Sequence, residues 1–468
     1  MPIVLTFDLG TTLFKACLFD NDGRLLAVAR LATPADHPQA GWSQIEPSRF
    51  DQTLHELVDQ LREQDASACQ RVGAICFATQ TNSMLLLDEH DEPLTPIILW
   101  DDRRAEDFHE QLSVFEAEPG FHEQTGIPAL SPQFALAKLL WLKQHEPAAW
   151  RRARQWRLIG DQLACRLTGR HVTEAGAAGL TGLLDIHQLQ WRARAVAAAG
   201  LSDVALPTPM RAGADLGVID RGLADAWRLP RHCRVVLGCL DQYAGAIGAG
   251  NVEPGQLSET TGTVLATVSL SSAFDAAPGA GVFQGPAWCE GRWWRMCFGF
   301  VSANLLEALR EAEPDRPSFA VLEAEAAAVP HGSAGLRLDP VKSQQAGRPV
   351  FEKLEAHHTR GHRVRAVYEG VARALQTQVA SLTASHRPNA IHAVGGAARS
   401  TLWLQIKADT LQIPVSAIDT AEPTSLGAAA LALATLTRER LATVAGRIAI
   451  TRETMRPTGG TSKSERAR

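Results

Sequence analysis

One pattern occurs twice in this chain and limits the folds that are open to it. An apolar segment at residues 3–7 runs into DLGTT at 8–12, and a second apolar segment follows. Near the middle of the chain, LSETTGT at 257–263 precedes another apolar run at 264–268. Each copy predicts a strand, a turn rich in Thr and Gly, and a further strand. We therefore predict two related lobes, the second of which begins near residue 251.

Length and the order of elements support this division. A chain of 468 residues, 45% of them apolar, exceeds what one hydrophobic core normally holds. Apolar runs of strand length alternate with stretches of helical periodicity, which indicates an α/β protein. We predict a first domain over residues 1–250, a second over 251–440, a cleft between them, and a C-terminal segment over 441–468.

The individual elements follow from the same periodicities. Residues 3–29 should form an antiparallel meander of three strands. Residues 150–200 are expected to be mainly helical, and the polar stretch from Thr451 onward is expected to be disordered. Further strands are predicted at 72–77, 84–87, 235–237 and 391–394, and helices at 50–61, 135–142, 242–249, 366–382, 402–411 and 423–433.

Charge and hydropathy exclude several classes of function. The formal charge is -5 and the pI about 6.3, which gives no electrostatic reason to bind nucleic acid or an anionic membrane. No run of 18 apolar residues occurs, and the start of the chain reads as a strand rather than a leader, so a cytoplasmic protein is expected. Eight scattered cysteines without a C-x-x-C pair predict reduced thiols.

The first turn carries groups that suit a phosphate. Backbone N–H groups and the hydroxyls of Thr11 and Thr12 would meet phosphate oxygens, and Lys15 would add positive charge. Asp8, at the end of the strand, offers the carboxylate oxygens that Mg²⁺ prefers. An ordinary hairpin turn without a ligand is the alternative for this segment taken alone.

The second turn and a glycine pair extend the same hypothesis. Gly262 and Thr263 repeat the phosphate-binding chemistry in the second half, although a plain Thr-rich β-turn is the favoured interpretation of this segment in isolation. Gly395-Gly396-Ala397 and Arg399 follow an apolar strand, and glycines there let the backbone approach a base or ribose. Two phosphate turns that face one cleft would make a nucleotide site.

A carboxylate at a strand end supplies the candidate base. Asp241 follows an apolar strand and precedes a short helix, with Gln242 beside it. Phosphoryl transfer to an alcohol needs a group that accepts the hydroxyl proton, which Asp241 could do. The alternative is an N-cap, a common place for Asp. No G-x-x-x-x-G-K-[ST] loop, protein-kinase motif or metal-ligand spacing occurs in the sequence.

Taken together, these segments resemble the FGGY carbohydrate kinases, a family within the actin-like ATPase superfamily. Within that family, the resemblance is to the xylulokinase-like branch. The resemblance extends to about residue 437. The matching segments lie in family order: FDLGTTLFKACLF at 7–19, IILWDDRRA at 97–105, FALAKLLWLKQHEP at 134–147, LGCLDQYAGAIGAG at 237–250, SETTGTV at 258–264, AVGGAARSTLWLQIKAD at 393–409 and EPTSLGAAALA at 422–432.

The resemblance implies a fold and a set of roles. It implies two ribonuclease-H-like domains that close on ATP-Mg²⁺ and a small sugar or polyol. Asp241 would be the base, Asp8 and Asp241 would hold Mg²⁺, and the two turns and the glycine motif would bind the nucleotide. The residues implied to face the acceptor are Gln80, Thr81, Asn82, Trp100, Asp101, Arg104, Asp241 and Gln242.

The acceptor is expected to be a ketopentose such as xylulose. Ribulose, other ketoses, tetritols, glycerol and sugar acids such as gluconate remain alternatives, as does a non-catalytic ATP-binding regulator or a sugar sensor. The acceptor segment, Gln80-Thr81-Asn82-Ser83, differs from the Gln-Met-His-Gly of xylulokinases and the Gln-Arg-Glu of glycerol kinases. The segment at 338–342 lacks the family's Gly-Glu-Arg-x-Pro element. A homodimer is expected only because dimers are common among enzymes.

Overall fold

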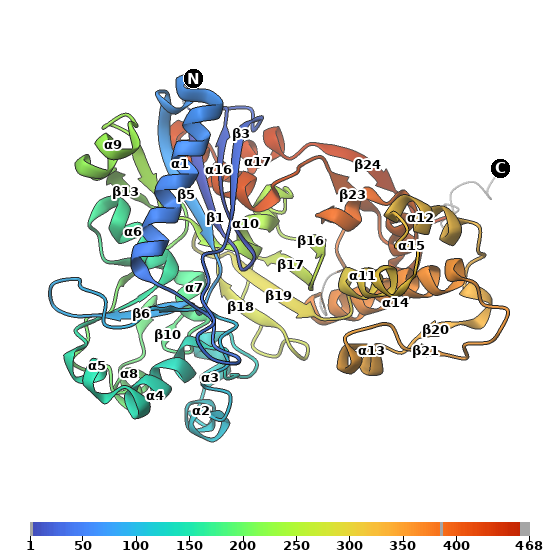
Figure 1. Cartoon of the computed structure of the whole chain (residues 1–468), viewed down its shortest axis with the longest axis horizontal. Coiled ribbons are helices and arrows are strands. Elements are labelled where there is room, and N and C mark those ends of the chain that lie inside the picture. Colours follow the sequence, from blue (N-terminus) through green and yellow to red (C-terminus); the bar gives the residue numbers. More distant parts are fainter. Residues whose placement is uncertain (1–2, 384–386, 459–468) are drawn as a thin grey trace.

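The computed structural model describes residues 3–383 and 387–458 and contains two large sheets (Figure 1). In the first sheet, β1 (Ile3–Leu9), β2 (Leu13–Phe19) and β3 (Leu25–Ala32) form the predicted antiparallel meander, and β5 (Val72–Thr79) pairs with β1 in parallel. The strands, in the order in which they pair, are β13 (Asp215–Val218), β14 (Arg234–Val236), β5 (Val72–Thr79), β1 (Ile3–Leu9), β2 (Leu13–Phe19) and β3 (Leu25–Ala32), with β15 (Cys239–Leu240) also on β5.

The second sheet repeats this plan. Four antiparallel strands are followed by a parallel strand, a second parallel strand and an antiparallel edge; apart from the additional outermost antiparallel strand, this is the order of the first sheet. This confirms the internal repeat read from the two Thr/Gly turns. The strands, in pairing order, are β18 (Phe283–Pro286), β19 (Trp293–Gly299), β17 (Leu265–Ser271), β16 (Gln256–Thr261), β22 (Ala390–Val394), β23 (Val415–Ile418) and β24 (Thr451–Met455).

Two helices pack on each other between the sheets. α16 (Pro423–Thr437) packs on β1 and β5 of the first sheet, and α10 (Asp241–Gly248) contacts α16 and also β16 and β17 of the second. Glycines permit this crossing, because a Cβ on Gly248 would lie 1.9 Å from the Pro423 carbonyl oxygen. A division of the chain at residue 250 therefore leaves α16 in contact with the sheet of the other half.

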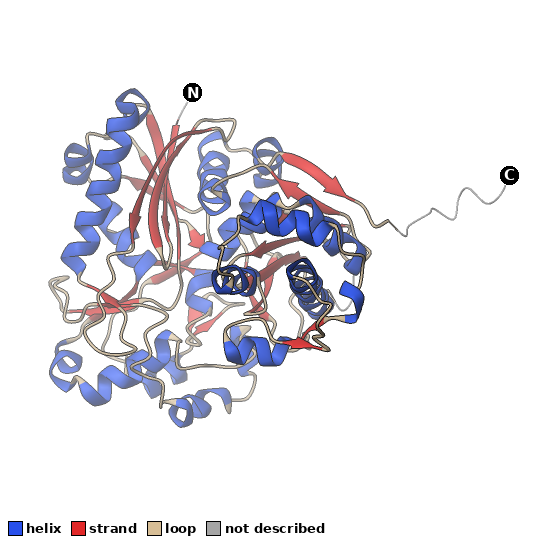
Figure 2. Cartoon of the chain, turned by 45° about the vertical axis from the view of Figure 1, so that its right-hand side comes forward, coloured by secondary structure: helices blue, strands red, loops and turns tan. Residues whose placement is uncertain are grey.

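The outer faces of both sheets are covered by further helices (Figure 2). Alternate residues of β1, such as Leu5 and Phe7, pack toward α1 (Pro47–Cys69), α6 (Ile159–Thr168) and α9 (Arg221–Trp227), whereas Val4 faces the α16 side. In the second half the core lies among the sheet and α11 (Ala303–Ala312), α12 (Phe319–Ala327), α14 (Arg360–Leu382) and α15 (Thr401–Leu411).

A smaller region extends from the first sheet. It contains a four-stranded sheet in the order β4 (Gln44–Ile45), β7 (Ile97–Ile98), β6 (Met84–Leu87) and β8 (Gln155–Leu158). Its helices are α2 (His109–Glu116), α3 (Phe121–Thr125), α4 (Ala135–His145), α5 (Pro147–Arg152), α7 (Ala175–Gly179) and α8 (Ala193–Ala199). Short pairs complete it: β9 (Val172–Glu174) with β12 (Thr208–Met210), and β10 (Leu184–Asp185) with β11 (Gln190–Trp191).

Two expectations about the elements are wrong. Residues 150–200 are not mainly helical, because β8, β9, β10 and β11 lie there between short helices; strands of two to four residues are too short to show a period. The tail is not disordered from Thr451, because Thr451–Met455 forms β24 on the edge of the second sheet. An edge strand with one partner tolerates its polar sequence. The rest of the predicted tail, from 459 on, lies outside the described residues.

Two simpler expectations concern thiols and membranes. All eight cysteines are free thiols, and seven of them are at least partly buried. Within residues 3–383 and 387–458, no helix has both the length and the apolar character that a membrane span requires.

Candidate active site

Three parallel strands of the first sheet end side by side and bring distant residues together. Asp8 of β1 and Cys239 of β15 both pair with Ala78 of β5, so the three strands are in register at that level. Neighbouring strands are spaced by about 4.8 Å, which puts the β1 and β15 backbones roughly 10 Å apart. Asp241 follows β15 directly. The predicted meeting of Asp8 and Asp241 at one sheet edge therefore follows from strand register.

A glycine makes the approach of β15 to β5 feasible. A Cβ on Gly238 would lie 1.5 Å from the carbonyl oxygen of Phe77. No other residue fits there without moving one of the two strands. Gly238 separates β14 from β15 and thus sets the position from which α10 and Asp241 begin.

The electrostatics of the two carboxyl groups are coupled. Burial raises the pKa of Asp8 to about 6, although the Lys15 ammonium, 3.4 Å away, opposes this. Burial and then the charge of Asp8 raise the pKa of Asp241 to about 7, while the Gln242 backbone N–H, 2.7 Å from its carboxylate, lowers it. A carboxyl group poised near neutral pH is suited to accept a proton from an alcohol.

Beside the first turn, Lys15 belongs to a small network of charged side chains. Its ammonium donates to Glu422 at 2.9 Å, and Arg30 donates to the other oxygen of the same carboxylate at 2.5 Å. Glu422 is buried immediately before α16. The sequence reasoning missed this residue as a site component, and its one signal was an acidic side chain at a helix start.

The first Thr/Gly turn leaves its hydroxyls toward solvent. Gly10 N–H donates to the Leu13 carbonyl at 3.2 Å and closes the turn, and Thr11 and Thr12 are exposed. The indole N–H of Trp100 donates to the Thr11 hydroxyl at 2.8 Å. Trp100, predicted to face the acceptor, thus contacts Thr11, predicted to bind the nucleotide. The residues predicted for the two ligands therefore adjoin at this contact.

The second turn is fixed from behind by a buried ion pair. Lys407 of α15 donates to Glu259 at 2.6 Å and to the Thr261 hydroxyl at 2.9 Å, and all three side chains are buried. Gly262 and Thr263 follow on the open side, with nothing within 4 Å of a Cβ on Gly262. Lys407 and Glu259 were not predicted, although a lysine among the apolar positions of α15 was a usable signal.

The glycine motif adjoins a cavity. Gly395 has a φ of 86°, which favours glycine, and Gly396 and Arg399 are exposed while Ala397 is buried. A cavity of about 120 Å³ lies against this motif. It is lined by Gly395, Ala398, Arg399, Ile418, Asp419, Thr420, Ala421 and Arg452.

The acceptor segment is largely buried and partly occupied by protein contacts. The Asn82 side-chain oxygen accepts from the Ala135 N–H at 2.9 Å at the start of α4. Gln80 accepts from the Ser83 hydroxyl at 3.1 Å, and Thr81 is 3.4 Å from the Ala177 carbonyl. Each of these predicted residues therefore has a structural partner within the protein.

Lys138 of α4 stabilises the acceptor segment through hydrogen bonds to backbone carbonyls. Its ammonium donates to the carbonyls of Gln133, Asn82 and Trp100 at 2.9, 3.1 and 3.1 Å. Burial lowers its pKa to about 7, against the attraction of Asp102. The loops that carry Asn82 and Trp100 are consequently tied to one point of α4.

Within the Trp100–Arg104 segment, some polar side chains are bonded to protein groups and others are not. Asp101 has a buried oxygen for which the described residues offer no hydrogen-bond partner. Arg104 instead donates to Asp102 at 2.8 Å and lies 4.0 Å over the ring of Trp42. The guanidinium of Arg104 is thus engaged by protein groups, and Asp102 is a structural residue that the sequence reasoning did not single out.

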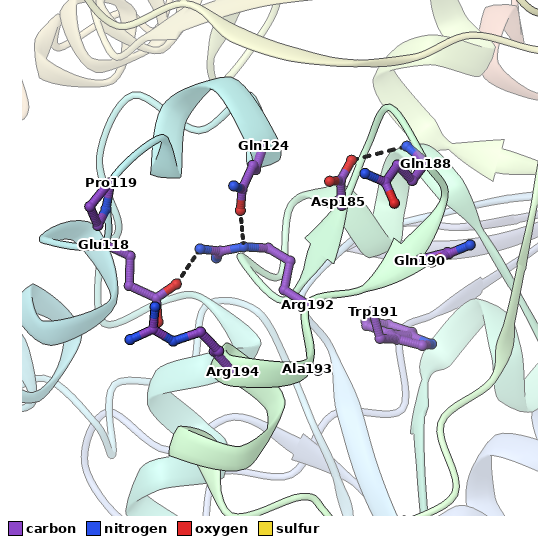
Figure 3. Close-up of a pocket in the computed structure, with 10 residues that line it drawn as sticks. All are labelled: Glu118, Pro119, Gln124, Asp185, Gln188, Gln190, Trp191, Arg192, Ala193 and Arg194. Carbon is purple, nitrogen blue, oxygen red and sulfur yellow. Dashed lines mark hydrogen bonds and ion pairs between the residues drawn. The ribbon is translucent and has the colours of Figure 1, made fainter.

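A larger pocket lies apart from the predicted residues (Figure 3). Its volume is about 340 Å³, and Arg192 on its wall donates to Gln124 at 2.9 Å and to the Gly182 carbonyl at 3.0 Å, and is also bonded to Glu118. It is lined by Glu118, Pro119, Gln124, Asp185, Gln188, Gln190, Trp191, Arg192, Ala193 and Arg194, none of which belongs to the predicted site.

Two lobes of repeated topology, each with a Thr/Gly turn, and two electrostatically coupled carboxyl groups at the strand ends of the first lobe define an ATP-dependent phosphotransferase of the actin-like ATPase fold. The FGGY family of carbohydrate kinases matches with its N-terminal domain over residues 3–248 and its C-terminal domain over 296–436. The chain belongs to this family, whose members phosphorylate sugar hydroxyls.

Individual relatives agree with the family. L-fuculokinase of Salmonella typhi is 29% identical over 444 residues, which cover 91% of each chain. Xylulose kinase of Lactococcus lactis is 28% identical over 448 residues, covering 92% of this chain and 87% of the relative. The crystal structure of xylulose kinase from Rhodospirillum rubrum superposes with a TM-score of 0.89 at 26% identity, covering 98% of this chain and 94% of that one.

Proposed function

We propose that this chain transfers the γ-phosphoryl group of ATP to a hydroxyl of a ketopentose such as xylulose, with Asp241 as the base. The observation that carries the proposal is the position of Asp241 at the end of β15, where burial and then the charge of Asp8 raise its pKa to about 7. The similarity to xylulose kinases favours a ketose over a sugar acid or glycerol as acceptor.

In the proposed phosphoryl transfer, different residues of the chain have different roles. Asp241 accepts the proton of the attacking hydroxyl and so directs its lone pair toward the phosphorus. Thr11, Thr12 and Thr263, all exposed beside backbone turns, bind phosphate oxygens, and Gly396 and Arg399 contact the nucleoside. The Trp100 indole holds Thr11 in place while its loop borders the acceptor.

A divalent cation fits the donor set beside Asp8. Asp8 and Asp241 lie at neighbouring strand ends of one sheet, and their carboxylate oxygens are the ligand type that Mg²⁺ prefers. Asp8 and Asp241 would hold it. When bound, Mg²⁺ offsets the charge of the phosphoryl oxygens.

An acceptor screen tests the proposal. ADP release is measured with xylulose, ribulose, fuculose, gluconate, erythritol and glycerol, and the highest kcat/KM is expected for a ketopentose. In the same assay, Asp241→Asn is expected to lose the ADP release that the acceptor stimulates. Asp220→Asn serves as its control, because Asp220 caps α9 and Asn caps a helix equally well. ADP release that no acceptor stimulates would reject a sugar kinase; a preference for gluconate or glycerol would reject the ketopentose.

A further inference from the structure

A half-exposed phenylalanine lies on the inner face of the second sheet. Residues of β19 alternate between the two faces, so that Trp294 and Met296 pack with the first lobe and Cys297 packs with the outer helices. Phe298 shares the face of Trp294 and Met296, yet its exposure is 49%. Trp294 stacks on Tyr243, two residues beyond Asp241, with ring centroids 5.2 Å apart. The face that carries Phe298 therefore looks toward the helix of the base.

Strand register sets Phe298 at one end of a row of residues. Val394, Thr260, Ala266 and Phe298 are paired in turn across β22, β16, β17 and β19. Three strand spacings separate the ends of the row by roughly 14 Å. The glycine motif begins immediately after Val394, and the second phosphate turn lies between β16 and β17. The order along this edge is thus nucleoside, phosphates, Phe298.

An aromatic stack continues from Phe298 into the first lobe. Phe298 stacks on Phe283 with ring centroids 5.3 Å apart and an interplanar angle of 17°. Phe283 stacks in turn on Phe134 at 6.4 Å and 25°. Phe134 immediately precedes Ala135, whose N–H is bonded to Asn82 of the acceptor segment. The three rings thus connect β19 of the second lobe to the start of α4, which is bonded to the acceptor segment of the first.

We infer that Phe298 is a specificity-determining residue whose ring packs on the face of C–H bonds of the acceptor sugar. This inference rests on the proposed function. Phe298 lies beyond the phosphates on the side opposite the nucleoside, which is where the acceptor of an in-line transfer sits. Its ring is backed by Phe283, so its orientation is fixed before a sugar arrives. Packing on C–H bonds would bury it and exclude water from the reacting hydroxyl.

The test compares Phe298 with a phenylalanine of similar exposure elsewhere. Phe298→Ala is expected to raise the KM of xylulose, or of the best acceptor in the screen, roughly tenfold, with the KM of ATP within twofold of the wild type. Phe298→Tyr keeps the ring and is expected to keep the acceptor KM. Phe319→Ala removes a ring that is 52% exposed on α12 and is expected to change neither constant.

The outcomes separate this inference from the proposed function. An acceptor KM that is the same in Phe298→Ala and Phe319→Ala overturns the inference while leaving the kinase intact. A rise in the KM of ATP instead would assign Phe298 to the nucleotide and would equally overturn it. If the wild type turns over no acceptor, the proposed function fails first. Similar melting temperatures for the two alanine variants are expected, since both side chains are about half exposed.

Discussion

Lys15 donates a hydrogen bond of 2.9 Å to Glu422, a residue 407 positions further along the chain. The contact ties the strand that follows the first phosphate turn to the start of α16. Because Lys15 also pairs with Asp8 at 3.4 Å, the Glu422 carboxylate is one contact away from a predicted cation ligand. The arrangement links the position of α16 to the charge around Asp8.

Glu422→Gln tests this link through stability. The substitution leaves Lys15 and Arg30 without their shared, buried counter-charge, and we expect a loss of about 1–2 kcal/mol in the free energy of unfolding, moderated because both cations reach solvent. Urea denaturation measures it. The comparison is Glu439→Gln, which breaks a more exposed pair with Arg447 and should lower the stability less than Glu422→Gln does. Equal costs would contradict a special role for Glu422.

Lys407→Met tests the ion pair behind the second phosphate turn. Glu259 would remain buried without a counter-charge, so we expect a loss of about 3–5 kcal/mol in unfolding free energy. The double variant with Glu259→Met should recover part of that loss, because it removes the uncompensated charge as well. A single variant as stable as the wild type in urea would show that the pair is not buried as described.

Gly248→Ala tests the crossing of α10 and α16. The added methyl group would collide with the Pro423 carbonyl at 1.9 Å, and we expect a loss of about 3 kcal/mol or more, or no folded protein. Gly446→Ala provides the contrast. Gly446 lies inside α17 (Leu441–Ile448) with open space at its Cβ, so alanine there should stabilise by about 0.5–1 kcal/mol. Thermal denaturation of the two variants should therefore shift in opposite directions.

Asp241→Asn tests the raised pKa without reference to turnover. A carboxyl group whose pKa rises on folding binds protons more tightly in the folded state, so its contribution to stability falls as the pH rises from about 4 through about 7. Above pH 7 the wild type carries that cost and the amide does not. We expect Asp241→Asn to be more stable than the wild type by about 1–2 kcal/mol at pH 8 and by little at pH 4. A variant that is less stable at pH 8 would contradict the raised pKa.

The sequence was informative where structure is local. The Thr/Gly turns between strands, the helix that starts at Asp241 and the glycine motif after β22 were predicted at their places, because period and turn chemistry depend on neighbours in the chain. Contacts between distant segments were not predictable in this way. The pairs Lys15–Glu422 and Lys407–Glu259 join residues far apart, and no local pattern specifies either partner.

The same limit applies to the site residues. Arg104 matched a motif, but only the structure shows its bonds to Asp102 and its contact with Trp42. Phe298 carried no signal at all, because a phenylalanine in a strand is normally a core residue and its exposure depends on the other lobe. The division into domains, the homodimer and the cytoplasmic location stay predictions.

The pH profile of kcat/KM for the acceptor tests the role of Asp241 most directly. The account predicts a limb that rises with pH to a plateau with an apparent pKa near 7, and a fall of about 10²–10⁴-fold in turnover for Asp241→Ala while ADP still binds. The remaining activity of that variant should lack the limb. An unchanged limb, or turnover close to that of the wild type, would contradict Asp241 as the base.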